Sequence, residues 1–321
     1  MNPALHYENV FLKPTFNSIQ TRSEIDTDVM FCGKTFRLPV IPANMKCCVD
    51  HDVCKMLDLE NYFYIMHRFD IDIVQFVEAA NNKAWMGEFK NISISVGTQS
   101  KDTSVITELA ARQLRVDFIT IDVAHGHHSK VADQVKFIKE KLPQVKVIAG
   151  NVATPYGVEY LQDSGADVVK VGIGGGYACT TKDKTGFTYP MFTCVQECAR
   201  VAQVPIIADG GVRCNGDITK ALVAGATMVM CGSIFASCSD SPAPVVRDEH
   251  GRKYKQYYGS ASIHNKNNNK NIEGTMRLME ADNFTYIEKM NEIQEDLQSA
   301  ISYAGGRDLS ALLNVQYGVR V

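Results

Sequence analysis

No apolar run in the 321-residue sequence approaches the roughly 18–20 residues that a transmembrane helix needs. Long basic runs are absent as well, and the formal net charge is −3. The sequence therefore gives no electrostatic reason to expect binding to nucleic acid or to an anionic membrane. The first residues, MNPALHYENV, lack a charged and then apolar signal pattern, and the last, YGVRV, form no retention or lipidation signal. We therefore expect a cytoplasmic protein.

A Cys-x-x-Cys motif is also missing, although the chain contains ten cysteines. Cys47 and Cys48 are adjacent, which suits reduced thiols in a large cytosolic enzyme better than disulfides. The spacing of Cys194 and Cys198 favours packing on one face of a helix. A structural zinc ion there would need two more ligands, and none is placed to complete the site.

The sequence does contain eight short apolar runs that alternate with helical segments. Each run is almost continuously apolar, as strands covered on both faces should be. The alternation predicts strand–helix units. The eight predicted strands are Pro39–Met45, Tyr62–Met66, Ile92–Gly97, Phe118–Ala124, Val145–Asn151, Val168–Gly174, Pro205–Gly211 and Met228–Ser233.

Helix signals lie between these runs. Thr154 and Pro155 supply an N-cap followed by a first-turn proline, and Gly165 and Gly225 are placed to end helices. Eight such units predict an α/β fold, a single (β/α)₈ TIM barrel that spans residues 1–321 as one catalytic domain. An open doubly wound sheet is the alternative, and the strand count disfavours it. The dinucleotide fingerprint G-x-G-x-x-G is also missing, because Tyr177 stands at its third glycine position.

Three peripheral segments complete the prediction. Residues 1–38 form an N-terminal extension that closes the bottom or the edge of the barrel. Ser239–Glu273 is a long polar loop after the eighth strand, and its asparagine-rich part, Asn265–Asn271, is expected to be mobile. Asp282–Ala304 is expected to be the last helix of the barrel, ended by Gly305 and Gly306.

Polar residues and glycines gather at the carboxyl ends of the predicted strands. In a barrel these ends meet at one rim, where active sites of barrel enzymes lie. This convergence predicts an enzyme. The residues are Asn44, His67, Arg68, Asp122, Asn151, Gly174 to Gly176, Asp209 to Gly211, Gly232 and Ser233.

The segment Val168–Lys182 ends its strand in three glycines, and Cys179 follows them directly. Glycines allow positive φ angles and a close approach of the backbone to a ligand. A thiol on such a loop is placed like a nucleophile, with the hydroxyls of Thr180 and Thr181 beside it. A buried structural cysteine next to a tight turn would give the same pattern. These residues alone leave both interpretations open.

Two further groups indicate ligands. Asp209-Gly210-Gly211 and Gly232-Ser233 end neighbouring strands where barrels commonly bind phosphate, and this interpretation is favoured over simple turns. Asp209 would then hold a ribose hydroxyl, because a carboxylate and a phosphate repel each other. The Asp122 to His128 cluster could ligate a metal, but contact with a second ligand such as a nicotinamide ring ranks higher.

Four motifs occur in a fixed order along the chain. They are Gly-Ile-Gly-x-Gly-x-x-Cys-Thr-Thr at 172–181, Ala-Asp-Gly-Gly at 208–211, Tyr-Tyr-Gly-Ser-Ala-Ser at 257–262 and Ile-Glu-Gly at 272–274. With these motifs the chain resembles the IMP dehydrogenase/GMP reductase family from about Tyr7 to about Leu309, and motifs at 64–69, 122–127 and 298–306 are similar to the bacterial form of its reductase branch. Dehydrogenases of the family usually carry a paired regulatory (CBS) insertion and a mobile flap with an Arg-Tyr pair. This sequence has no room for the insertion between His67 and Ile92, and it has no such pair between Ser262 and Glu273.

This resemblance implies reductive deamination of GMP to IMP and ammonia with NADPH, in purine nucleotide salvage, by a homotetramer. Cys179 would form a covalent thioimidate with the purine, and Thr181 and Glu273 would handle protons. The alternatives are an NAD-dependent oxidation of IMP and a purine-nucleotide-binding protein with impaired catalysis. The implied substrate-binding residues are Asp209, Gly210, Gly211, Gly232, Ser233, Gly259, Ser260, Ala261 and Gly274. The implied cofactor-binding residues are Arg68, Asp122, Val123, Ala124, Ile173 and Gly174. Backbone carbonyls of Gly174, Gly176 and Cys179 are candidate ligands of K⁺.

The sequence departs from this family at the loop before the cysteine. The family usually has Gly-Pro-Gly followed by Ser or Arg, whereas this chain has Gly175 at the proline position and Tyr177 after Gly176. Losing the proline loosens the loop. Tyr177 also removes a small or basic group that can contact the substrate phosphate, so the phosphate and cation contacts of this loop are the ones that the departure affects.

Overall fold

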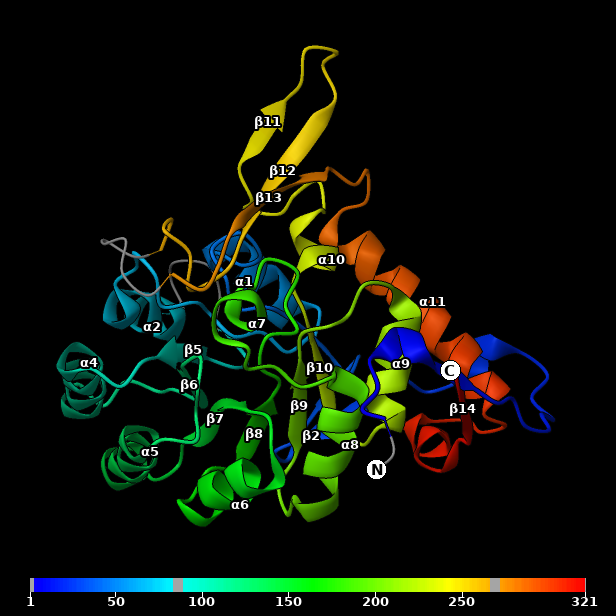
Figure 1. Cartoon of the computed structure of the whole chain (residues 1–321). Helices are drawn as coiled ribbons and strands as arrows, with labels where there is room; N and C mark the ends of the chain where they lie inside the picture. The colour runs from blue at the N-terminus through cyan, green and yellow to red at the C-terminus, as the bar shows by residue number, and fades with distance from the viewer. Residues whose placement is uncertain (1–2, 83–88, 266–271, 321) are drawn as a thin grey trace.

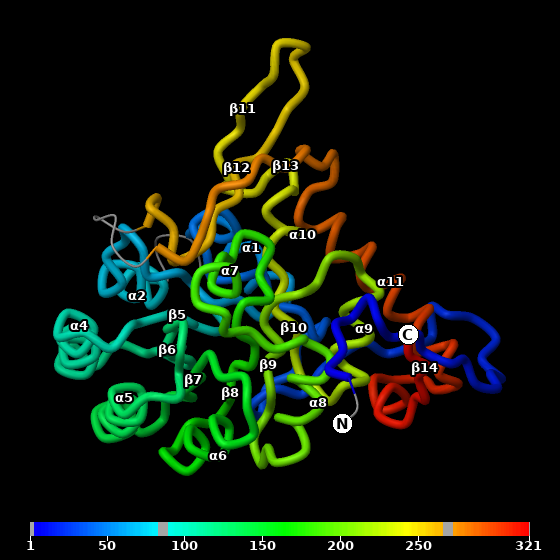
Figure 2. Tube along the Cα trace, viewed as in Figure 1, coloured from blue at the N-terminus to red at the C-terminus, as the bar shows by residue number. Residues whose placement is uncertain are grey.

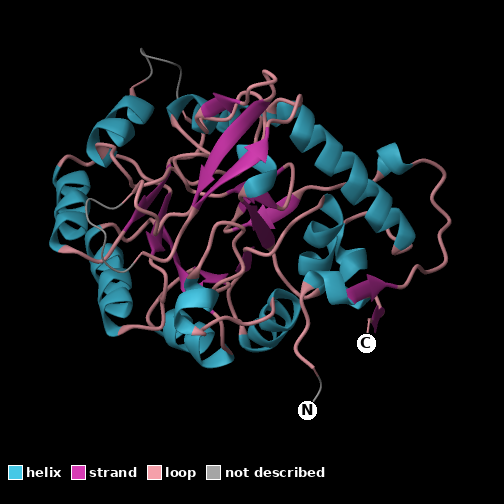
Figure 3. Ribbon diagram, turned by 45° about the horizontal axis from the view of Figure 1, so that its top comes forward, coloured by secondary structure: helices cyan, strands magenta, loops and turns pink. Residues whose placement is uncertain are grey.

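Seven parallel strands form the centre of the protein, a computed structural model that describes residues 3–82, 89–265 and 272–320. Their order in the sheet is β4-β10-β9-β8-β7-β6-β5. The sheet curls and the longer helices lie outside it (Figures 1 and 3), which confirms the predicted α/β barrel architecture. The strands are β4 (Val40–Pro42), β5 (Ser93–Val96), β6 (Phe118–Asp122), β7 (Lys146–Val152), β8 (Val168–Val171), β9 (Ile206–Asp209) and β10 (Met228–Cys231).

The predicted second strand, Tyr62–Met66, is wrong as a regular strand. It makes one isolated parallel bridge, from Met66 to Ile94, in which the Met66 N–H donates to the Ser93 carbonyl at 3.0 Å. Tyr64 reaches the same neighbour through its side chain, since its hydroxyl donates to the Asn91 carbonyl at 2.6 Å. The segment is buried as predicted, and the Tyr64 hydrogen bond joins it to the neighbouring segment beyond the single bridge.

In the described parts of the chain, eight longer helices surround the sheet, and their ends follow the local signals. The Thr154 hydroxyl accepts the Gly157 N–H, and Gly165 and Gly225 have φ angles of +101° and +108° just beyond two helices, as predicted. The last helix begins at Tyr286 and not at Asp282, because Thr285 and Glu288 form a capping box. The helices are α1 (His51–Leu59), α2 (Ile73–Asn81), α4 (Ser100–Ala111), α5 (Ser129–Lys141), α6 (Pro155–Asp163), α8 (Met191–Val201), α9 (Asn215–Val223) and α11 (Tyr286–Tyr303). The short helices α7 (Thr181–Thr185) and α10 (Ser233–Ala236) follow β8 and β10, and none of the described helices could cross a membrane.

The N-terminal extension covers the bottom of the barrel, as expected. Its hairpin, β2 (Val29–Phe31) and β3 (Lys34–Phe36), places the Phe31 ring 5.1 Å from Phe63 and 6.1 Å from Phe118. Strand β1 (Val10–Leu12) pairs antiparallel with β14 (Tyr317–Val319), so the two ends of the chain lie side by side (Figure 2). Three 3₁₀ helices complete this region: Tyr7–Asn9, Arg22–Glu24 and Leu309–Asn314.

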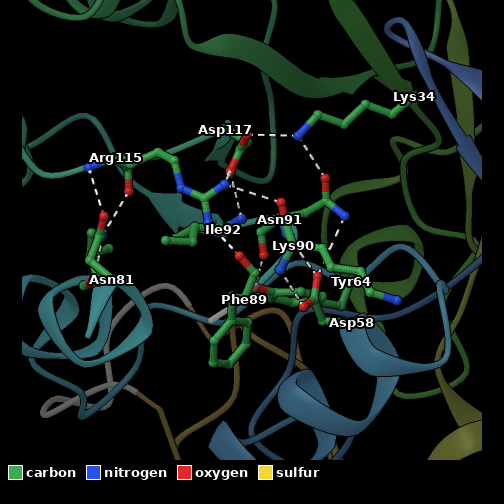
Figure 4. A network of polar contacts seen from close by, with 11 residues as sticks. Lys34, Asp58, Tyr64, Asn81, Phe89, Lys90, Asn91, Ile92, Arg115 and Asp117 are labelled. Carbon is green, nitrogen blue, oxygen red and sulfur yellow. Dashed lines mark hydrogen bonds and ion pairs between the residues drawn. The ribbon is translucent and has the colours of Figure 1, made fainter. Parts of the chain in front are cut away.

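A polar network secures the entry to β5 and β6 at the same end (Figure 4). Asp58, which is fully buried, accepts the backbone N–H groups of Lys90 and Asn91 at 2.7 and 2.8 Å. Asp117 accepts the Lys34 ammonium at 2.7 Å and the Ile92 N–H at 2.9 Å. The two carboxylates thus satisfy backbone groups that no strand pairs, and they tie the hairpin to the barrel.

We predict that Asp58→Asn lowers the free energy of unfolding by about 1–3 kcal/mol. The amide nitrogen that replaces one carboxylate oxygen cannot accept a buried backbone N–H. Urea denaturation would measure the loss, and Asp163→Asn, an exposed carboxylate at the end of α6, is the matched control with an expected change within about 0.5 kcal/mol. Equal midpoints for the two variants would contradict this role of Asp58.

The predicted polar loop after the eighth strand contains regular structure, which corrects the expectation for Ser239–Glu273. Strands β11 (Val245–Arg247), β12 (Lys253–Tyr258) and β13 (Met276–Glu280) form an antiparallel sheet, and β11 and β12 project away from the barrel (Figure 1). The sequence hides β12 because Lys255 looks like a surface residue. Its side chain is buried, and its ammonium donates to the carbonyls of Ser239 and Ser241. Of the predicted mobile stretch Asn265–Asn271, residues 266–271 lie outside the described residues.

Candidate active site

A cavity of about 870 Å³ opens at the carboxyl ends of the barrel strands. Loops after β6, β8 and β9 line it, together with the segment that joins β12 to β13. The sequence-predicted residues that line it are Asn44, Arg68, Asp122, Val123, Ala124, Asn151, Ile173, Gly174, Gly175, Gly176, Cys179, Thr181, Asp209, Gly210, Gly259, Ser260, Ala261 and Glu273. Gly211, Gly232, Ser233 and Gly274 lie next to it without lining it.

A chain of hydrogen bonds starts at the cavity thiol. The Cys179 Sγ donates to the Thr181 hydroxyl at 3.1 Å, and that hydroxyl donates to the Glu273 carboxylate at 2.8 Å. Thr181 begins the short helix α7, whereas Glu273 comes from the other end of the loop that precedes β13. The arrangement allows a proton to pass between the thiol and the carboxylate through one hydroxyl.

Backbone pairing brings Glu273 to the cysteine. Cys179 and Gly274 form an antiparallel bridge, which explains why Gly274 lies behind the cavity wall. The Thr180 N–H donates to the Glu273 carbonyl, and the Thr275 N–H donates to the Ala178 carbonyl, both at 2.9 Å. The Glu273 N–H donates in turn to the Ala261 carbonyl at 3.1 Å. The carboxylate is therefore positioned by a miniature sheet.

The glycines of the cysteine loop are needed for close packing against the end of β9. Gly172 has a φ of +136°, and a Cβ there would lie 2.1 Å from the Asp209 carbonyl oxygen. The Gly211 N–H donates to the Gly175 carbonyl at 3.0 Å. A side chain at Gly172 would force the loop away from Asp209, so this glycine fixes the distance between the loop and the end of β9.

Lys170 is a site residue that the sequence prediction missed. Its side chain is 3% exposed, and its ammonium lies 2.5 Å from an Asp209 oxygen and 3.5 Å from an Asp122 oxygen. Burial alone would lower the pKa of Lys170, but the two carboxylates outweigh it and raise that pKa above the ordinary lysine value. Asn151 also donates to the same Asp209 oxygen, at 2.9 Å. The sequence signal that could have identified Lys170 is that it is the single lysine in the otherwise apolar strand β8.

Arg68 and Asp122 meet at the end of β6. One Arg68 Nη donates to the Asp122 carbonyl at 3.1 Å, and the Arg68 Nε lies 4.0 Å from the Asp122 carboxylate. This Nε is buried without a hydrogen-bond partner. Arg68 also lines the cavity, where a guanidinium can bind an anionic group of a ligand.

His67, next to Arg68, gives the protein a predicted dependence on pH. Its Nδ1 accepts the Phe69 N–H at 3.2 Å, and burial followed by the nearby Lys46 lowers the pKa of His67 from 6.5 to about 4. Because the unfolded chain binds the proton more readily, stability from this group is complete above pH 6.5 and falls as the pH drops toward 4. The full effect is roughly 3 kcal/mol.

His67→Asn should remove most of that effect, since the amide oxygen can accept the Phe69 N–H but does not titrate. Urea unfolding at pH 4, 5 and 7 would show a steeper loss of stability for the unaltered protein than for the variant. Parallel pH curves would contradict the role given to His67.

Three of the four predicted phosphate ligands, Gly211, Gly232 and Ser233, lie beside the cavity, whereas Gly210 lines it. The Tyr257 hydroxyl occupies the space in front of Gly232, where a Cβ would lie only 2.3 Å from it. Gly232 lies directly before α10, and Ser233 is the first residue of that helix. The Gly211 N–H already donates to the Gly175 carbonyl. Phosphate binding by these three residues stays a prediction.

The histidine cluster after β6 does not form a metal site in the described parts of the chain. No group of three or more His, Cys, Asp or Glu side chains converges there. The His125 and His127 rings are 6.4 Å apart, and the His127 ring packs 5.0 Å from that of Tyr160. His127 is thus an exposed side chain that contacts Tyr160.

Comparison with known proteins gives the family. The model of the "IMP dehydrogenase / GMP reductase domain" matches residues 4–320. Relatives called GMP reductase include those of Delftia acidovorans (45% identical over 313 residues, 97% of this chain and 94% of the relative) and Lactococcus lactis subsp. cremoris strain SK11 (46% over 325 residues, 99% and 96%). The protein of Oceanobacillus iheyensis is 45% identical over 325 residues, with 99% and 96% covered. This chain belongs to the IMP dehydrogenase/GMP reductase family.

Proposed function

We propose that the protein is a GMP reductase, which converts GMP to IMP and ammonia with NADPH as the reductant, in purine nucleotide salvage. The observation that carries this proposal is the hydrogen-bonded series Cys179, Thr181 and Glu273 in the rim cavity of a family member. The overall reaction balances as GMP plus NADPH plus two protons giving IMP, NADP⁺ and ammonium.

The first half of the reaction belongs to the chain's own residues. Glu273 accepts the Cys179 proton through the Thr181 hydroxyl, and the thiolate forms a bond to C2 of the guanine ring. The C2–N bond then breaks, and the same carboxylic acid returns the proton so that ammonia leaves. The product is a thioimidate between Cys179 and the purine.

The second half requires a hydride at C2, which bound NADPH supplies. When the C2–S bond breaks, the electron pair returns to Cys179 as thiolate, and IMP is released. Arg68, Asp122, Val123, Ala124, Ile173 and Gly174 would hold the nicotinamide part, and all six line the cavity. Asp209 would bind the ribose, and Gly210, Gly211, Gly232 and Ser233 the phosphate. Gly259, Ser260, Ala261 and Gly274 would line the purine.

Other parts of the proposal rest on the sequence pattern and on the family resemblance. They are a single catalytic domain of residues 1–321, a homotetramer in the cytoplasm, and K⁺ bound by carbonyls of Gly174, Gly176 and Cys179. The Gly176 carbonyl already accepts the Cys179 N–H at 3.1 Å, so a cation would share that oxygen.

Anaerobic mixing of protein, GMP and NADPH tests the function. We expect equal amounts of NADPH consumed and ammonium released, with IMP as the product. NADH formation from IMP and NAD⁺, without NADPH consumption in the presence of GMP, would instead identify a dehydrogenase. Tight binding of GMP with neither reaction would identify a nucleotide-binding protein that has lost catalysis.

A further inference from the structure

Two arginine side chains lie over the ring of Tyr177, the residue at which the cysteine loop departs from the family pattern. The guanidinium carbons of Arg213 and Arg277 are 5.2 and 4.9 Å from the centre of that ring. The two cations are thus at most about 10 Å apart. This set of three side chains is called the Tyr177 cluster below.

Backbone geometry delivers each arginine to the ring. Arg213 follows Gly210 and Gly211 at the end of β9, and one of its Nη atoms donates to the Gly175 carbonyl at 3.1 Å. Arg277 lies on β13 directly opposite Tyr257 of β12. The bridge between Cys179 and Gly274 places the start of β13 alongside the cysteine loop, which brings Arg277 to Tyr177.

The positive charges of this cluster are not neutralised by the described part of the chain. Neither guanidinium makes an ion pair with a carboxylate of residues 3–82, 89–265 or 272–320, whereas Arg252 nearby in sequence pairs with Asp248 at 2.7 Å. Both arginines are exposed to solvent. Stacking on an aromatic face holds them together in spite of their mutual repulsion. A concentration of unpaired guanidinium groups is a site for an anion with several oxygens.

The cluster stands beside the predicted phosphate ligands. The Tyr177 and Tyr257 rings are 6.1 Å apart, and the Tyr257 hydroxyl lies in front of Gly232 at the end of β10. On the β9 side, a Cβ on Gly210 would lie 3.1 Å from the Gly176 nitrogen, so this strand end also touches the loop that carries Tyr177. Tyr177, which carries both arginines, is therefore linked to the glycines of both strand ends through Tyr257 and through Gly176.

We propose that Arg213 and Arg277, held on the Tyr177 ring, bind the 5′-phosphate of the purine nucleotide. They take over the contact that a small or basic residue at position 177 would make. A phosphate monoester carries about −1.5 to −2 charges at pH 7, which matches two guanidinium groups. The inference rests on the proposed function for the identity of the nucleotide, and it makes Arg213 and Arg277 determinants of specificity for nucleotide over nucleoside.

Binding of IMP and of inosine, measured by calorimetry without cofactor, tests the inference independently of turnover. For Arg213→Met and for Arg277→Met we expect IMP affinity to fall roughly tenfold to hundredfold, while inosine affinity stays within twofold. Arg200→Met is the matched control, an exposed arginine in the last turn of α8, and should leave both affinities unchanged. Absence of catalysis would overturn the proposed function but leave this binding result readable.

The ring provides a second test. Tyr177→Phe keeps the aromatic face and should retain IMP affinity, whereas Tyr177→Leu should lower it as the arginine variants do. Equal losses for IMP and inosine, or no loss for either, would overturn the inference. If the arginine variants weakened NADPH binding and left IMP unaffected, the guanidinium groups would serve the cofactor's 2′-phosphate, and the assignment to the substrate would be wrong.

Discussion

Cys179→Ala is expected to lower the turnover of GMP by at least ~10⁴-fold, to the level of the uncatalysed background. Without the sulfur atom no bond can form to C2 of the purine, and ammonia has no route off the ring. The affinity for IMP should stay within about twofold, because no part of the phosphate, ribose or purine contacts proposed above depends on the thiol. Steady-state NADPH consumption and IMP calorimetry measure the two quantities.

A matched variant separates the nucleophile from cysteines in general. Cys32→Ala changes a half-buried thiol in the turn between β2 and β3, at the opposite end of the barrel, and should keep full turnover. Mass spectrometry after mixing with GMP in the absence of NADPH should detect a covalent adduct on the unaltered protein and none on Cys179→Ala. Turnover that survives in Cys179→Ala would refute the covalent mechanism.

The barrel could be predicted because its signals are local. Strands covered on both faces read as continuous apolar runs, and the ends of α6 and α9 are set by Gly165 and Gly225. The sequence could not show that Tyr62–Met66 lacks regular strand pairing, because a buried segment has the same apolar pattern whether or not its backbone pairs with a neighbouring strand. Strand β12 was missed for the opposite reason, because a lysine such as Lys255 is typical of a surface loop. Nothing in the local sequence shows that its buried ammonium donates to two backbone carbonyls.

In the candidate site too, some residues could be predicted from the local sequence and others could not. The glycine loop and Cys179 stand out in the sequence, and their position at the rim follows from the strand count. Glu273 lies far from Cys179 along the chain, and only the family resemblance connected the two before the structure showed the bond through Thr181. For the Tyr177 cluster, the sequence showed that Tyr177 departs from the family pattern. It did not show that Arg213 and Arg277 lie on the Tyr177 ring, because only the fold brings these residues together.

Lys170→Met is expected to reduce the free energy of unfolding by about 3–5 kcal/mol, since it leaves Asp209 and Asp122 facing each other without their shared cation. Lys146→Met is the matched control. Lys146 also contacts a carboxylate, that of Asp167 at 3.4 Å, but its side chain is 44% exposed, so the expected loss is below about 1 kcal/mol. Urea denaturation compares the two variants, and equal losses would show that the burial of Lys170 has no special weight.

A loss of stability alone would not show that Lys170 positions Asp209 for the ribose. The ratio of the affinities for GMP and 2′-deoxy-GMP tests this positioning role, because only a correctly held carboxylate accepts a hydrogen bond from the ribose hydroxyl. The unaltered protein should prefer GMP, and Lys170→Met should lose most of that preference at a temperature where the variant is folded. Lys170→Arg, which retains the charge, should recover part of the preference. A merely structural lysine would change stability and leave the ratio of the two nucleotide affinities unchanged.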